Sequence, residues 1–233
     1  MPSQTRPRIG ITTSFNDDEQ RLHHRYVQAV EEAGGLPLVA PMLGSDDATR
    51  DFAALLDGLV ITGGPAVTDG LTGDLPDDLG DTDPVREEAD RRLLRAFEKH
   101  HRASPRPVLG ICYGMQLLNA EAGGTIYGDV EREREGAATH SQKRGADTHP
   151  VRLEPDSHFA RVLEASELTV NTRHLQAIAA PGQGYRVAAT APDGVPEAIE
   201  SEDGAVLGVQ FHPERMGADT QPLFRHLVEQ ARG

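Results

Sequence analysis

The sequence Pro107-Val108-Leu109-Gly110-Ile111-Cys112-Tyr113-Gly114-Met115-Gln116 places a cysteine between two glycines, in the pattern G-x-C-x-G. The apolar residues 107–110 predict a short buried strand, and residues 115–120 predict the start of a helix. A strand, a sharp turn and a helix are the context in which a nucleophile is held on an elbow. Glycines suit the flanking positions because the strand and helix backbones pass close to such a turn.

Cys112 is the only cysteine of the chain, so it has no disulfide partner within it. At the start of a helix its sulfur would lie at the positive end of the helix dipole, which favours the thiolate form. The pattern therefore indicates a nucleophile. A second interpretation stays open, because a single cysteine is often a buried apolar residue with no chemical role.

The sequence Gly208-Val209-Gln210-Phe211-His212-Pro213-Glu214 supplies the groups that a cysteine nucleophile needs. An expected strand over residues 205–210 ends just before His212, and a carboxylate follows two positions later. An imidazole accepts the proton of the thiol, and an acid orients the ring and stabilises its charged form. We therefore predict that Cys112, His212 and Glu214 form a catalytic triad.

The two motifs together resemble those of the class I glutamine amidotransferases. Within this superfamily the chain is most similar to the γ-glutamyl-γ-aminobutyrate hydrolase type, in the peptidase C26 family. The resemblance extends over nearly the whole chain. The other segments that carry it are Gly63-Gly64, Asp83–Glu87, His149–Val151, Asn171–His174 and Ala191–Gly194. It implies a flavodoxin-like α/β fold and a cysteine hydrolase that acts on γ-glutamyl compounds.

Apolar runs alternate with amphipathic segments along the chain. Strands are expected over residues 8–12, 36–39, 58–61 and 107–110, and helices over 22–33, 46–56, 84–101, 115–120 and 219–232. This alternation predicts an α/β fold with a doubly wound, mostly parallel sheet, whose site lies at the carboxyl ends of the strands. Four further segments predict an antiparallel β extension, at 151–153, 168–170, 185–189 and 198–200.

The length of 233 residues suits one α/β domain, and we expect a single glutamine amidotransferase-like hydrolase domain over residues 1–233. The formal net charge of −14 argues against nucleic acids and anionic membranes as partners. The N-terminal residues lack an apolar signal region, and no apolar stretch is long enough to span a membrane. Together with the single cysteine, these features favour the cytoplasm.

The segment Thr62-Gly63-Gly64-Pro65 follows the third expected strand. On its own the segment is typical of an ordinary turn. The resemblance implies that it is an oxyanion loop, in which the backbone N–H groups of Gly64 and Tyr113 point at the developing negative charge. A Cβ atom at Gly64 would obstruct that close approach.

The segment Asn171-Thr172-Arg173-His174-Leu175-Gln176 ends another expected strand. The hydrolase branch typically has Asn-Ser-x-His-His-Gln here, so Thr172 and Leu175 depart from its pattern. The resemblance implies that this turn holds the α-amino and α-carboxylate groups of the glutamyl moiety, partly through its backbone. The expected substrate-binding residues are Gln116, Asn171, Thr172, Arg173 and His174.

Two histidines compete for the role of general base. His174 lies in the substrate turn, whereas His212 follows a strand and has a carboxylate two residues away. We assign the base to His212, because only this histidine has an acid placed to orient it.

Residues 69–84 form an expected loop rich in aspartate and glycine, and loops of this length are often functional. The resemblance places it beside the acceptor side of the pocket. The six carboxylates of the loop would attract a cationic leaving group and oppose an anionic one. Asp83 suits the N-cap of the next helix, with Pro84 in the first turn, and we prefer that structural role to a substrate contact.

His140 and His149 flank a polar loop and raise the question of a metal site. Neither has a partner at the spacing of metal ligands in the sequence, so we expect no metal. The resemblance calls for no cofactor.

The expected reaction is hydrolysis of a γ-glutamyl amide in a small molecule, through a glutamyl thioester, with release of glutamate. One alternative is a glutaminase subunit that supplies ammonia to a separate synthetase, because Tyr113 follows the cysteine as in the elbow of GMP synthetases. Another is a non-catalytic binding module, which the intact Cys112, His212 and Glu214 argue against. The leaving amine, a synthetase partner and homo-oligomerisation stay open.

Overall fold

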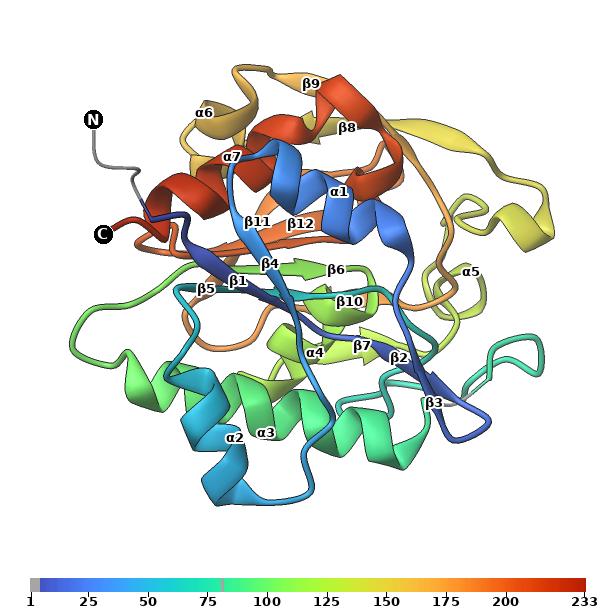
Figure 1. Cartoon of the computed structure of the whole chain (residues 1–233). Helices are drawn as coiled ribbons and strands as arrows, with labels where there is room; N and C mark the ends of the chain where they lie inside the picture. The colour runs from blue at the N-terminus through green and yellow to red at the C-terminus, as the bar shows by residue number, and fades with distance from the viewer. Residues whose placement is uncertain (1–4, 81) are drawn as a thin grey trace.

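The structure, a computed structural model, describes residues 5–80 and 82–233 (Figure 1). A nine-stranded sheet runs through the molecule in the order β4-β1-β5-β6-β13-β12-β11-β8-β9. In that order the strands are β4 (Leu36–Val39), β1 (Arg8–Ile11), β5 (Gly58–Ile61), β6 (Val108–Ile111), β13 (Val206–Val209), β12 (Pro196–Ser201), β11 (Tyr185–Thr190), β8 (Thr148–Leu153) and β9 (Glu167–Asn171).

The sheet has a parallel part and an antiparallel part. The strands β4, β1, β5, β6 and β13 pair in parallel, whereas β12, β11, β8 and β9 continue the sheet with antiparallel pairing. The central strands β5 and β6 are buried along their whole length, because helices cover both faces of a parallel sheet. The predicted α/β fold, a doubly wound parallel sheet with an antiparallel β extension, is confirmed.

Helices lie on both faces of the sheet in Figure 1. The longer ones are α1 (His24–Glu32), α2 (Asp46–Ala53), α3 (Pro84–His100), α4 (Tyr113–Glu121) and α7 (Gln221–Gln230), and the shorter ones are α5 (Val130–Glu133) and α6 (His158–Leu163). One apolar cluster joins α1, α6 and α7 to the sheet, and a second joins α2, α3 and α4 to it. Along β5, Val60 belongs to the first cluster, while Leu59 and Ile61 belong to the second, as the alternation of a strand requires.

Two small sheets accompany the large one. The strands β2 (Ser14–Asn16) and β3 (Glu19–Arg21) form a hairpin, and β7 (Thr125–Tyr127) pairs with β10 (Ala177–Ala180). Asp17 and Asp18 in the hairpin turn have φ angles of 52° and 61°, which is the conformation of a two-residue hairpin loop. The sequence did not predict β2 and β3, because the hairpin is polar and largely exposed and so shows no apolar alternation. It did not predict β10 either, although the four residues of that strand are apolar.

Two helix N-termini show how the local sequence sets the boundaries. Ser45 caps α2 with its side chain, which accepts a hydrogen bond from Ala48 N. Asp46 and Asp47 lie in the first turn, where they face the positive end of the helix dipole. Asp83 caps α3 as predicted, because its carboxylate accepts a hydrogen bond from Val85 N at 2.9 Å.

The segment from residue 69 to residue 83 connects the region after β5 to α3. Its described residues form turns and one isolated bridge, between Leu71 and Ile126, and Asp81 lies outside the described residues. The described residues of this segment therefore form the loop that the sequence predicts.

None of the helices in the described part of the chain has both the length and the apolar character that crossing a bilayer requires.

Candidate active site

Cys112 lies on a sharp turn between β6 and α4. Its φ of 52° lies in the left-handed region, which costs a non-glycine residue about 1–3 kcal/mol. Cys112 N donates a hydrogen bond to Val209 O at 2.7 Å and so holds the turn against β13. A Cβ atom at Gly114 would lie 2.2 Å from Ile61 O, and one at Gly110 would lie 2.8 Å from the Gly114 carbonyl. The expected elbow, with its need for both glycines, is confirmed.

His212 reaches the same edge of the sheet, because it follows β13 and β13 is parallel to β6. Its Nδ1 is 2.9 Å from Oε1 of Glu214. Glu214 has a buried side chain and lies in the short 3₁₀ helix η2 (Pro213–Arg215). Asn171 holds the His212 backbone from both sides: its Oδ1 accepts from His212 N at 3.1 Å, and its Nδ2 donates to His212 O at 2.9 Å. The predicted base and the predicted acid are therefore in direct contact.

The electrostatic surroundings of His212 favour its charged form. Burial alone would lower the pKa of the ring, but Cys112 and Glu214 act in the opposite direction and raise it to about 9. The ring therefore carries a proton at neutral pH. Gln210 Nε2 also donates toward the Cys112 sulfur at 3.5 Å. A cationic ring and an amide donor therefore both lie beside the Cys112 sulfur.

The loop of Gly63 and Gly64 follows β5 and is supported by Arg86 of α3. Arg86 Nη2 donates to Thr62 O at 3.2 Å and to Gly63 O at 3.0 Å. A Cβ atom at Gly64 would lie 2.3 Å from Arg86 Nη1, so the arginine occupies the space that a side chain would need. The guanidinium also lies over the Tyr113 ring, 4.4 Å from its centroid. One arginine thus packs against both residues that were predicted to form the oxyanion hole.

Arg86 is a residue for which the sequence suggested no function. Its side chain is 1% exposed, and its Nε is 3.3 Å from Asp90 Oδ2. Arg86 and Asp90 share one face of α3 with the buried Leu93 and Phe97. Two charged residues at the spacing of an apolar helix face are the signal that was available, because such residues are buried only as a pair.

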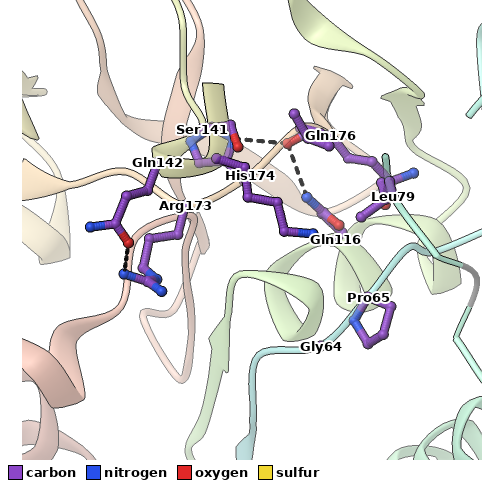
Figure 2. Close-up of a pocket in the computed structure, with 11 residues that line it drawn as sticks. Gly64, Pro65, Leu79, Gln116, Ser141, Gln142, Arg173, His174 and Gln176 are labelled. Carbon is purple, nitrogen blue, oxygen red and sulfur yellow. Dashed lines mark hydrogen bonds between the residues drawn. The ribbon is translucent and has the colours of Figure 1, made fainter. Parts of the chain in front are cut away.

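A cavity of about 300 Å³ lies beside this loop (Figure 2). Among the residues predicted to bind substrate, Gln116, Arg173 and His174 line the cavity, and Gly64 of the oxyanion loop lines it as well. Gln116 Nε2 donates to Gln176 O at 3.2 Å, as the dashed line in Figure 2 shows. The cavity therefore joins the elbow helix to the turn that follows β9.

Asn171 and Thr172 do not line this cavity with the other residues of the turn. Asn171 binds the backbone of His212, and Thr172 Oγ1 donates to His140 O at 2.6 Å. Their side chains therefore support the turn. The His174 ring is buried and directs its Nε2 toward Glu197 Oε1, 3.4 Å away. Because this nitrogen of His174 points toward Glu197, His212 remains the candidate for the general base.

The charge of the cavity is opposite to the charge expected from the acidic loop. Lys143 and Arg173 line the cavity, and the described part of the loop contributes Leu79. The Asp78 carboxylate is bound to Arg144, with an oxygen 2.8 Å from its Nη2. The charged residues that line the cavity are therefore positive, which does not support the sequence-based expectation that the acidic loop attracts a cationic leaving group.

A cluster of three histidines and a glutamate corrects another expectation. His140 and His149 were expected to lack partners of ligand spacing, but both lie beside His174 and Glu197. The partners were missed because they come from distant parts of the sequence. Burial alone would raise the pKa of the Glu197 carboxyl, but the three imidazoles around it hold that pKa well below its ordinary value. Glu197 is therefore a buried anion.

Comparison with known proteins identifies the family of the chain. Residues 7–214 match the family model of Peptidase C26. A glutamine amidotransferase-like protein of Lactococcus lactis, YvdE, is 32% identical over 196 residues, which cover 81% of this chain and 78% of that protein. The γ-glutamyl-γ-aminobutyrate hydrolase of Escherichia coli O157:H7 is 30% identical over 225 residues, which cover 89% of this chain and 85% of that protein.

A solved structure extends the comparison to the fold. A Thermoplasma acidophilum protein assigned as a GMP synthase subunit superposes with a TM-score of 0.65. The superposition covers 98% of this chain and 95% of that one at 18% identity, so it supports the fold alone. The family model matches most of the chain, and the relatives are at least 30% identical over most of their own length, so this chain belongs to the peptidase C26 family.

Proposed function

We propose that the chain is a cysteine-dependent hydrolase that cleaves a γ-glutamyl amide bond in a small molecule and releases glutamate. The observation that carries the proposal is the 2.9 Å contact of His212 with Glu214 beside the strained elbow of Cys112. A nucleophile, a base and an acid that orients the base are the parts of a hydrolytic triad. Membership of the peptidase C26 family supports the same reaction type.

In the proposed reaction the Cys112 thiolate attacks the δ-carbonyl carbon of the glutamyl group. The N–H groups of Gly64 and Tyr113 stabilise the oxyanion of the tetrahedral intermediate. His212 carries a proton at neutral pH and gives it to the leaving amine, so that a glutamyl thioester remains on the sulfur. Water that His212 deprotonates then hydrolyses the thioester and frees glutamate.

The cations of the cavity support a substrate with more than one carboxylate. The glutamyl moiety brings one α-carboxylate, and a leaving group such as γ-aminobutyrate adds a second. Lys143 and Arg173 favour the substrate with the larger negative charge. The Escherichia coli relative is named for γ-glutamyl-γ-aminobutyrate. We therefore propose this compound, or a similar γ-glutamyl amino acid, as the preferred substrate.

The test is a comparison of kcat/KM for γ-glutamyl-γ-aminobutyrate, γ-glutamylputrescine and glutamine, with glutamate release as the readout. At low salt we expect γ-glutamyl-γ-aminobutyrate to be preferred over γ-glutamylputrescine, and added salt should narrow the difference. A preference for γ-glutamylputrescine at low salt would refute the charge argument. Release of no glutamate from any of the three, or equal release by Cys112→Ala, would refute the hydrolase itself.

Two results would select the other candidates. Glutamine turnover that exceeds that of both γ-glutamyl compounds would identify an ammonia-supplying protein, an assignment favoured by Tyr113 next to the nucleophile. A Cys112 that does not react with iodoacetamide at neutral pH would identify a binding module, because a thiolate beside an imidazolium is alkylated readily.

A further inference from the structure

We propose that His140, His149, His174 and Glu197 together bind one divalent transition-metal ion, and that zinc is the ion that fits them best. His140 precedes the 3₁₀ helix η1 (Gln142–Arg144), and His149 lies in β8. His174 lies in the turn after β9, and Glu197 lies in β12. The cluster therefore belongs to the antiparallel part of the sheet, and none of its four residues is a member of the predicted triad.

The four ligand atoms have nearly the separation that a tetrahedral ion requires. His140 Nδ1, His149 Nε2 and His174 Nε2 are each 3.4 Å from Glu197 Oε1. All four atoms lie within 4.8 Å of one another. Ligand atoms about 2.0–2.2 Å from a tetrahedral zinc ion are about 3.3–3.6 Å apart. The three nitrogen-to-oxygen distances match this value, so only the nitrogens need to move closer together around an ion.

The same atoms lack the hydrogen bonds that buried polar groups normally have. Within the described residues, none of the three ring nitrogens and neither oxygen of Glu197 has a hydrogen-bond partner. The 3.4 Å contacts are longer than the roughly 2.7–2.9 Å of a charge-assisted hydrogen bond. Glu197 is fully buried, and a buried carboxylate that accepts no hydrogen bond is strongly unfavourable. A cation at the centre of the cluster satisfies all of these atoms together.

The far nitrogen of each ring is held in the way that is typical of metal-bound histidines. Each far nitrogen has an oxygen acceptor, and this contact turns the free nitrogen toward Glu197. The three contacts are His140 Nε2 to Asp193 Oδ2 at 2.8 Å, His174 Nδ1 to Gln176 O at 2.9 Å and His149 Nδ1 to Pro150 O at 3.2 Å. An acceptor on one ring nitrogen places the proton there, so the lone pair of the other nitrogen is free to bind a metal.

The ligand set indicates the class of metal and its role. Imidazole nitrogens suit zinc, cobalt, nickel and copper, whereas magnesium and calcium prefer oxygen ligands. Four protein ligands in a buried position leave no open site for a substrate, which is typical of structural zinc. The ion would join β8, β12 and the turn after β9. Because Arg173 and His174 of that turn line the cavity, the metal would hold the substrate side of the site in place.

The experiment uses the full chain and measures metal binding directly. The protein is stripped with a chelator, and zinc chloride and cobalt chloride are then titrated against it. We expect one equivalent of zinc per chain and an intense visible spectrum for the cobalt form, because tetrahedral cobalt absorbs far more strongly than octahedral cobalt. Zinc at about 100 times its Kd should raise the thermal midpoint by about 5–10 °C.

Two ligand variants and one control identify the site. His149→Ala changes the ligand that is most exposed, with 16% of its side chain accessible, and is the variant least expected to disturb folding. Glu197→Gln keeps the size of the fully buried ligand. Both variants should weaken zinc binding by about 100-fold or more. Even the loss of a residue that only hydrogen-bonds to a metal ligand lowers metal affinity by about 10–100-fold. The exposed His24→Ala should bind as tightly as the wild type.

Each outcome decides the question, and none depends on hydrolysis. Equal zinc affinity in the wild type and His149→Ala would overturn the proposal, as would the weak spectrum of octahedral cobalt in the wild type. Failure of the wild type to retain or bind zinc would also overturn the proposal, and the histidines would then serve only to surround the Glu197 carboxylate. If Glu197→Gln fails to fold, the zinc affinity of His149→Ala and the cobalt spectrum of the wild type still decide whether the cluster binds a metal.

Discussion

Arg86→Met removes the buried cation behind the predicted oxyanion loop and keeps an apolar chain of similar length. The change leaves Asp90, only 4% exposed, without its ion-pair partner. Breaking a buried pair from one side costs about 3–5 kcal/mol. For a chain of this size, that loss lowers the thermal midpoint by about 6–20 °C.

The pH dependence of this loss identifies its cause. Burial raises the pKa of Asp90 to about 6 in the wild type, even though Arg86 lowers it, and removal of Arg86 raises that pKa further. The folded variant then binds a proton that the unfolded chain has already lost, so its stability falls as the pH rises. We expect a larger loss at pH 8 than at pH 5, measured by urea unfolding at both values.

A second substitution separates stability from activity. Asp90→Asn added to Arg86→Met removes the unpaired charge and should restore most of the lost stability at pH 8. Glutamate release should stay about 100-fold below the wild type, because the loop still lacks the hydrogen bonds from Arg86 to Thr62 and Gly63. An Arg86→Met variant within about 1 kcal/mol of the wild type at pH 8, or a double variant as unstable as the single one, would refute this reasoning.

Four further predictions concern the elbow and the base. Cys112→Ala should lower glutamate release by more than about 100-fold with the fold intact by circular dichroism, and a smaller loss would exclude it as the nucleophile. His212→Asn should nearly abolish turnover, and Glu214→Gln should lower it less. Alkylation of Cys112 should slow in both variants. An unchanged alkylation rate in His212→Asn would exclude His212 as the base. Because the pKa of His212 is raised to about 9, its stabilisation is full below about pH 6.5 and is lost as the pH rises through 9, so the thermal midpoint should fall over this range more in the wild type than in His212→Asn. Gly114→Ala should destabilise the chain by more than about 1 kcal/mol, because its Cβ would lie 2.2 Å from a backbone oxygen of β5. The control Gly44→Ala has open space around its Cβ and should leave the stability unchanged. Similar unfolding midpoints for the two variants would contradict the steric account.

The parallel part of the sheet was predictable because its signals are local. The strands β5 and β6 are continuous apolar runs, and the glycines around Cys112 mark a turn that no larger residue fits. The contact of His212 with Glu214 was also predictable, since the two residues lie only two positions apart in the sequence. A local sequence pattern is sufficient to predict a contact when both residues belong to the same short segment of the chain.

The rest depended on contacts between distant segments. Arg86 supports a loop more than twenty residues earlier, and its sequence neighbours indicate only a helix. Glu197 meets His140 although 57 positions separate them, and the pairing follows from the order of strands in the antiparallel part of the sheet. The positive charge of the cavity was missed because Lys143 and Arg173, which line it, lie far from the acidic loop in the sequence.

The two hydrogen bonds between Asn171 and the His212 backbone have a consequence for protein engineering. They tie the turn that lines the cavity to the residue predicted to act as base, so the two parts of the site are not independent modules. A segment transplanted from a relative to change substrate preference must bring an asparagine at position 171. Without it the graft would supply new recognition and at the same time release the backbone of His212, which fixes the ring beside Cys112.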